Sequence, residues 1–64
     1  MALWDYNKSV EIDALDPSFD AIIMAAVRKA DSGNLYRLET LFPDLVVEMR
    51  QRYNSPGGLL EGES

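Results

Sequence analysis

In "LETLFPDLVVEM", residues 38–49, a proline interrupts a pattern that is otherwise typical of one amphipathic helix. Proline has no backbone N–H, and inside a helix its ring clashes with the carbonyl group four residues earlier, which costs about 3 kcal/mol. Pro43 also disfavours helical backbone angles at the preceding residue, Phe42. Because proline followed by an acidic residue is typical of a helix start, Pro43 and Asp44 predict that one helix ends here and another begins.

Apolar residues recur with helical spacing on both sides of this break, and the chain is predicted to be mainly α. The pattern predicts three short helices, at about residues 17–32, 34–42 and 43–53. Asp16 and Pro17 suit the N-cap and the first position of the first helix, and Gly33 suits the left-handed position that ends it. Asn34 suits the N-cap of the second helix, and "NSPGG", residues 54–58, ends the third.

The segments on either side of this helical core, residues 16–54, are predicted to be less regular. In residues 1–15 apolar and polar side chains alternate, which is typical of an extended arm or a short β-strand. A lone strand leaves its backbone groups unpaired. The arm is therefore expected to form a small hairpin that turns at Asn7 and Lys8, to lie over the helices, or to pair with another chain. Residues 55–64 carry few apolar groups and are predicted to be a mobile, flexible tail.

Length and composition exclude several classes of function. With 64 residues the chain is one domain at most, and it contains neither cysteine nor histidine. The thiolate nucleophile, the commonest general base and the usual transition-metal ligands are therefore absent, so we expect no catalytic residue and no enzyme activity. Glu11, Asp13 and Asp16 lack the glycine spacing of a calcium loop. We expect no metal site and no cofactor.

The charge of the chain favours a protein partner over nucleic acid. Its net charge is −5, which opposes binding to a phosphate backbone. Residues 24–42 fit the pattern of a helix-turn-helix, but its recognition helix would offer only Arg37 as a basic side chain. Nucleic-acid binding is therefore not expected. No apolar run approaches the roughly 20 residues that span a bilayer, so no membrane contact is expected and the protein is predicted to be cytoplasmic.

Acidic and aromatic residues near the N-terminus are the candidates for binding a partner with a basic surface. The predicted set is Trp4, Asp5, Tyr6, Glu11, Asp13, Asp16 and Asp20. Acidic side chains would speed the encounter, and exposed aromatic rings would anchor the complex. The alternation of residues 1–15 places Trp4 and Tyr6 on one face together with Val10 and Ile12. The alternative is that both rings are buried in the protein's own core and the acids only keep it in solution.

The first predicted helix is apolar around much of its circumference. Ala21, Met24 and Ala25 widen its apolar face beyond a single stripe. One interpretation is a central core helix. The other is an interface, because a small chain has little material with which to cover two faces of a helix. On the second interpretation these three residues mediate self-association, and we expect a homodimer.

The stretch "ADSGNLYRLETLFPDLVVEMRQRYNSPGG", residues 30–58, resembles short uncharacterised reading frames of bacteria and of their phages or prophages. The resemblance implies a small accessory protein in the cytoplasm of a bacterial host. The expected function is stoichiometric binding or inhibition of a host protein. The alternative is a self-associating structural or assembly component, such as a virion subunit or an assembly chaperone. A DNA-binding repressor would need a basic recognition face that the sequence lacks.

Overall fold

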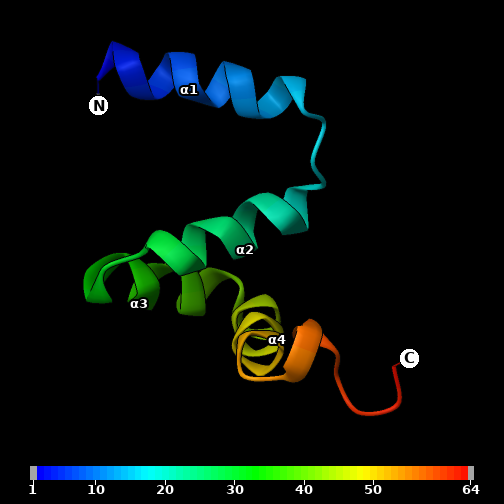
Figure 1. The fold of residues 1–64 in the computed structure, drawn as a ribbon. Coiled ribbons are helices and arrows are strands. Elements are labelled where there is room, and N and C mark those ends of the chain that lie inside the picture. Colours follow the sequence, from blue (N-terminus) through cyan, green and yellow to red (C-terminus); the bar gives the residue numbers. More distant parts are fainter. Residues whose placement is uncertain (1, 64) are drawn as a thin grey trace.

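The computed structural model describes residues 2–63, and this part of the chain contains four α-helices and no strand. The helices are α1 (Leu3–Ala14), α2 (Phe19–Lys29), α3 (Ser32–Leu41) and α4 (Pro43–Tyr53), and a short 3-10 helix, η1 (Pro56–Gly58), follows them. Figure 1 shows α2, α3 and α4 as one packed group, with α1 standing apart above α2. The prediction of a mainly α chain is confirmed.

The break predicted at Pro43 is confirmed. Phe42 has φ −133° and ψ 59°, which lies outside the helical region, and this one residue ends α3 and precedes α4. Pro43 is the first residue of α4, where its missing N–H leaves no helical hydrogen bond unmade, and Asp44 lies in the first turn. The range predicted for this helix, residues 43–53, matches the observed one.

The other two predicted helices differ from the observed ones at their ends. Ser18, rather than Asp16, caps α2, and its Oγ accepts a hydrogen bond of 3.0 Å from the backbone N–H three residues later. Asp31, rather than Asn34, caps α3, because its Oδ1 accepts the Asn34 N–H at 2.8 Å. Gly33 consequently lies inside α3 instead of ending the helix before it. Several neighbouring residues have side chains that can cap a helix. The N-cap is the one whose side chain accepts a hydrogen bond from a backbone N–H of the first turn.

The prediction of an extended or β arm over residues 1–15 is wrong, because most of it forms α1. The alternating apolar residues also fit helical spacing along two narrow stripes, which are Leu3, Tyr6, Val10 and Ala14 on one side and Trp4, Ile12 and Leu15 on the other. Asp5 accepts the Ala2 N–H at 3.4 Å in the first turn. Lys8 pairs with Glu11 at 3.0 Å, three residues further on. These local contacts favour a helix over a strand.

α4 lies at the centre of the packed group and contacts α2, α3 and η1. Its side chains form the buried core of the described residues, since Val46 is only 1% exposed and Met49 only 6% exposed. At the break before α4, the ring of Phe42 packs edge to face against Phe19 at the start of α2, with ring centroids 5.8 Å apart. The chain is therefore folded around one face of α4.

The molecule is more open than a compact protein of its length. Its radius of gyration is 13.5 Å, whereas about 10.7 Å is expected for 64 residues. Its accessible surface is 5411 Å², against about 4,100 Å² for a compact monomer of this mass. Part of the excess is apolar surface of α1, in which no residue is buried. Much of the apolar material of the chain is therefore left in contact with solvent.

We expect Val46→Ala to lower the free energy of unfolding by about 2 kcal/mol, because it removes two buried methyl groups and leaves a cavity. Val47, the next residue of α4, is 52% exposed, so Val47→Ala is a matched control that should change this free energy by less than about 0.5 kcal/mol. Urea denaturation followed by circular dichroism measures both. Equal effects of the two substitutions would show that the buried face of α4 is wrongly assigned.

Candidate protein-binding surfaces

α1 presents aromatic side chains to solvent. Trp4 is 65% exposed and Tyr6 is 64% exposed, so neither ring is part of a core within the described chain. The Lys8 ammonium lies over the Trp4 ring, 5.5 Å from its centroid. The two rings do not share a face as expected for a strand, because residues two apart are about 200° apart around a helix. α1 therefore carries an exposed aromatic ring on each of two sides.

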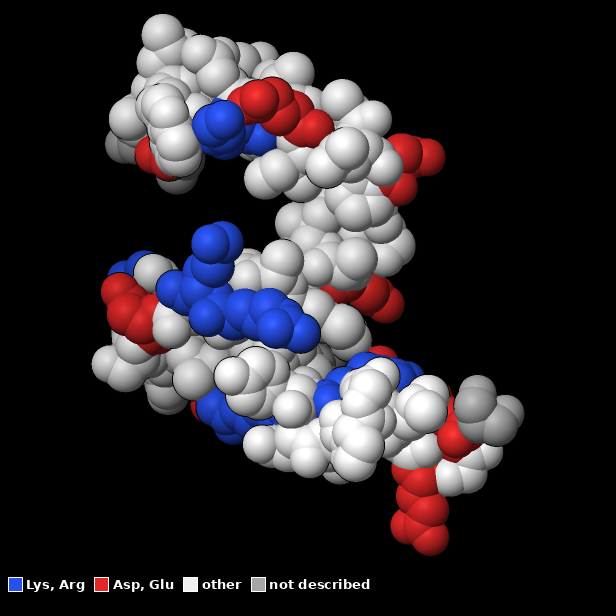
Figure 2. Space-filling view, in the orientation of Figure 1, with Lys and Arg blue, Asp and Glu red and all other residues white. Residues whose placement is uncertain are grey.

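The acids of the predicted partner-binding set are distributed over α1, the linker and α2. Asp5, Glu11 and Asp13 lie on α1, Asp16 lies in the linker, and Asp20 lies in the first turn of α2. All five are exposed. Figure 2 shows acidic side chains on α1 and on the side of the molecule where the linker joins α1 to α2. The structure thus spreads these acids over three elements instead of gathering them on one face.

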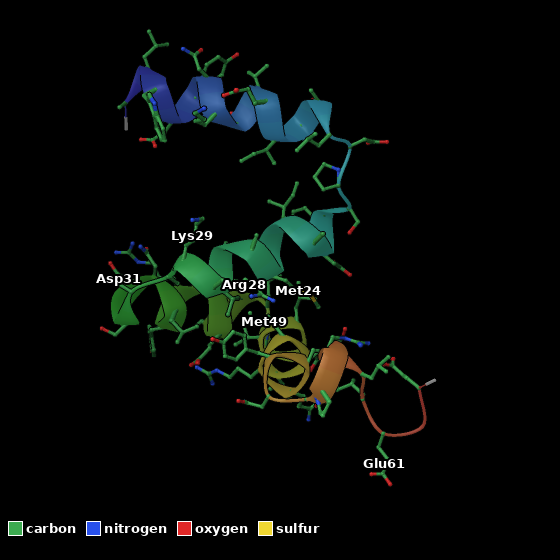
Figure 3. The ribbon with its side chains drawn as sticks, in the orientation of Figure 1. Met24, Arg28, Lys29, Asp31, Met49 and Glu61 are labelled. Carbon is green, nitrogen blue, oxygen red and sulfur yellow. The ribbon has the colours of Figure 1, made fainter. Side chains whose placement is uncertain are left out.

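The residues predicted to mediate self-association lie on α2 with different exposures. Ala21 and Ala25 are exposed, and Met24 is half-buried. Met24 lines a groove beside α4 and η1, together with Met49 and Arg52. Figure 3 shows Met24 and Met49 close together between α2 and α4. Met24 therefore faces a recess that another chain could fill.

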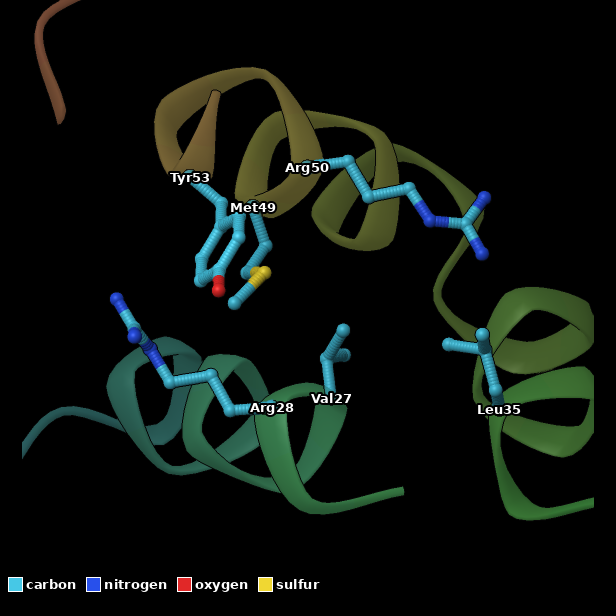
Figure 4. Close-up of a pocket in the computed structure, with 6 residues that line it drawn as sticks. All are labelled: Val27, Arg28, Leu35, Met49, Arg50 and Tyr53. Atoms are coloured by element: carbon cyan, nitrogen blue, oxygen red, sulfur yellow. The ribbon is translucent and has the colours of Figure 1, made fainter. Parts of the chain in front are cut away.

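A second groove, between α2 and α4, combines an apolar floor with a basic rim (Figure 4). Its volume is about 370 Å³, and its lining is Val27, Arg28, Leu35, Met49, Arg50 and Tyr53. The spacing of Tyr53 on the helix over residues 43–53 predicts a core position, but Tyr53 is 67% exposed. The Arg28 guanidinium lies over its ring, 5.5 Å from the ring centroid.

The positive charges of the chain divide into paired and unpaired groups. Arg50 forms an ion pair with Glu39, and Arg52 forms ion pairs with two glutamates. Within residues 2–63, Arg28, Lys29 and Arg37 have no acidic partner. Figure 2 shows a basic area across α2, part of which rises into the gap below α1. These three cations lie within residues 28–37 of the sequence. Whether each of them meets an acidic side chain depends on side-chain geometry, which the sequence does not show.

Arg52 connects the C-terminal segment to α4. Its two terminal nitrogens donate to the Glu63 carboxylate at 2.8 and 2.9 Å, and one of them also donates to the Gly58 carbonyl at 2.9 Å. Its Nε donates to Glu48 at 3.0 Å. The segment predicted to be a mobile tail is thus folded back onto α4, and it borders the groove at Met24. Gly57 and Gly58 of η1 form part of the lining of that groove.

The same contacts shift two pKa values. Hydrogen bonds to Glu63 and then to Glu48 raise the pKa of Arg52 above its ordinary value. The hydrogen bond from Arg52, followed by the one from the Leu60 N–H, lowers the pKa of Glu63 from 4.5 to about 2. Both groups therefore stay charged at neutral pH, and the contact between them is lost only in acid.

Nowhere in residues 2–63 do three or more carboxylate, histidine or cysteine side chains come together as potential metal ligands. In the same part of the chain, no helix combines the length and the apolar character needed to cross a bilayer.

Comparison of the chain with family models, with curated proteins and with solved structures found no match. The assignment of function therefore rests on the surfaces of α1 and of the grooves beside α4.

Acid should release the C-terminal segment. Because the pKa of Glu63 is lowered by folding, its contact with Arg52 stabilises the folded-back segment above about pH 4.5 and is lost as the pH falls towards 2. An NMR titration of the Leu60 amide should show this transition. Glu63→Gln should shift the amide already at pH 6, whereas Glu61→Gln should not, because Glu61 points away from the molecule (Figure 3). A Leu60 amide without any change between pH 5 and 2 would contradict this role of Glu63.

Proposed function

We propose that this chain is a small acidic protein-binding module without catalytic function, and that it binds stoichiometrically to another protein with a basic surface. The observation that carries the proposal is the exposure of α1. This helix has 12 residues and none of them is buried. An isolated helix of about this length is only marginally stable in water, so α1 needs a surface to pack against. The packed group of α2, α3 and α4 does not supply one.

The charge of α1 supports a basic partner. Three acids of α1, Asp5, Glu11 and Asp13, are set against the single cation Lys8. Exposed charges of this kind act over roughly 8 Å at physiological salt and speed the encounter with an oppositely charged surface. They contribute less to the lifetime of a complex, which depends on buried anchors. In this proposal the exposed rings of Trp4 and Tyr6 are those anchors.

The resemblance of residues 30–58 to phage and prophage reading frames supports a biological setting for this activity. In that setting the protein is an accessory factor of a phage or mobile element, and it inhibits a host protein in the bacterial cytoplasm by occupying its surface. A basic surface that normally holds nucleic acid would suit an acidic inhibitor, because carboxylates can take the places of phosphates.

A second candidate function is a self-associating structural or assembly component. The observation that favours it is the accessible surface of 5411 Å², which exceeds that of a compact monomer of this mass, together with large apolar side chains such as Leu3 and Leu15 that are exposed. A closed symmetric oligomer that binds no foreign protein would support this alternative, whereas a complex with one basic bacterial protein would support the inhibitor.

The proposal predicts that capture of a partner depends on α1. Tagged protein should retain a basic protein from a bacterial lysate, and Tyr6→Ala or Trp4→Ala should reduce the amount retained at least several-fold, because an aromatic anchor is lost. Tyr36→Ala is the matched control, since Tyr36 lies on α3 and is 71% exposed. Quantitative mass spectrometry measures retention. Equal retention by the Tyr6 and Tyr36 variants would exclude α1 as the binding element.

A second prediction concerns the acids of α1. With a purified partner, the double variant Glu11→Gln/Asp13→Asn should associate several-fold more slowly and with a weaker salt dependence, because charge steering is reduced. The double variant Asp44→Asn/Glu61→Gln removes the same charges outside α1 and is the matched control. Surface plasmon resonance at several salt concentrations measures both rates. If the two double variants behave alike, net charge rather than the acidity of α1 steers the encounter.

A further inference from the structure

The groove between α2 and α4 has the chemistry of a site for an acidic amphipathic helix. Its floor contains Val27, Leu35 and Met49, and Arg28 and Arg50 flank it. Binding of a helix in an apolar groove is a common mode of recognition, and methionine adapts well to such contacts. Arg50 already has Glu39 as a partner, whereas Arg28 has no carboxylate within the described residues. The rim therefore retains an unpaired positive charge.

The chain itself contains one helix of the matching kind. α1 carries Leu3, Tyr6 and Val10 at helical spacing along one stripe, and these side chains are 75%, 64% and 52% exposed. Acidic side chains flank this stripe and outnumber the single cation of the helix. We propose that α1 of a second copy of the chain docks in the groove between α2 and α4, and that the exchange is reciprocal in a symmetric dimer. This goes beyond the proposed function because it requires no foreign protein.

The linker favours a second copy over the chain's own α1 as the occupant. α1 ends with hydrogen bonds from Leu15 N–H to the Ile12 carbonyl and from Asp16 N–H to the Asp13 carbonyl, at 3.1 and 2.9 Å. Asp16 then adopts a left-handed conformation with φ 55°, and the ring of the following proline fixes the next φ angle. Figure 1 shows that this linker holds α1 and α4 on opposite sides of α2. α1 is thus directed away from its own groove.

The surface area is sufficient for a stable dimer. The accessible surface of 5411 Å² exceeds that of a compact monomer by about 1,300 Å². A protein interface of standard size buries about 800 Å² on each partner. An interface of this size would therefore remove about 60% of the excess surface of each copy. It would also provide the packing that a short helix needs.

Sedimentation equilibrium on the purified full chain tests the proposal without any other protein. At tens of micromolar the mass should be twice the monomer value of 7.2 kDa. Dilution should lower the mass and the helical circular dichroism together, because α1 loses its packing on dissociation. A monomer at every concentration overturns the proposal. If Arg28→Glu lowers the helix content of such a monomer, α1 occupies the groove of its own chain.

Charge reversal then locates the interface. Arg28→Glu should raise the dissociation constant of the dimer on the order of tenfold or more, because like charges meet at both symmetric contacts. Arg37→Glu is the matched control, since Arg37 is an exposed arginine of α3 whose side chain donates to Asn34 and does not line the groove. An equal effect of the two variants would exclude the groove, because only the first lies on its rim.

A rescue experiment pairs this variant with one in α1. Glu11→Lys/Asp13→Lys should weaken the dimer as Arg28→Glu does, and an equimolar mixture of the two variant chains should restore it, because acid again meets base at both contacts. Circular dichroism of each variant at high concentration confirms that the packed group of helices is intact. Failure of the mixture to associate more tightly than either variant alone would show that α1 does not lie against Arg28.

Discussion

Pro43 cannot donate a backbone hydrogen bond, and the arrangement of the helices depends on how the chain accommodates this missing donor. The loss is harmless only in the first turn of a helix, where backbone N–H groups have no partner in the helix. The chain therefore ends α3 at Phe42 and starts α4 at Pro43. The change of direction lets α4 contact both α2 and α3. It also brings the ring of Phe42 onto Phe19. The core at Val46 and Met49 follows from this one turn of the chain.

A core centred on one face of α4 leaves the rest of the apolar material without cover. α2 uses one side to pack on α4, and its exposed alanines, Ala21 and Ala25, remain outside that contact. α1 lies beyond α2 and reaches none of this core, since none of its residues is buried. The entropy lost on ordering a helix must be offset by burial or by hydrogen bonds. α1 is therefore the element whose stability depends most on a surface supplied from outside the packed group.

The sequence predicts the helical class, the break at Pro43 and the bounds of α4, because proline chemistry and apolar spacing act locally there. It does not predict α1, since alternation over a short segment fits both a strand and two stripes of a helix, and the choice depends on local bonds such as that between Lys8 and Glu11. Helix caps are ambiguous for a similar reason, because Asp16 and Ser18 both qualify. The groove beside α4 brings together residues from three helices, so no spacing in the sequence reveals it.

The net charge of −5 conceals a separation of charge that relates the two proposed binding surfaces. Acids dominate α1 and the linker, whereas Arg28 and Lys29 at the end of α2 are unpaired within the described residues. A helix that is acidic and apolar suits either a foreign basic surface or the groove of another copy. It cannot occupy both. Self-association would therefore compete with a foreign partner for α1, and the apparent affinity for that partner would fall in proportion to the fraction of chains whose α1 is free. The concentration of the protein would then decide which surface α1 meets: the partner at low concentration, and a second copy as the concentration rises past the dimer dissociation constant.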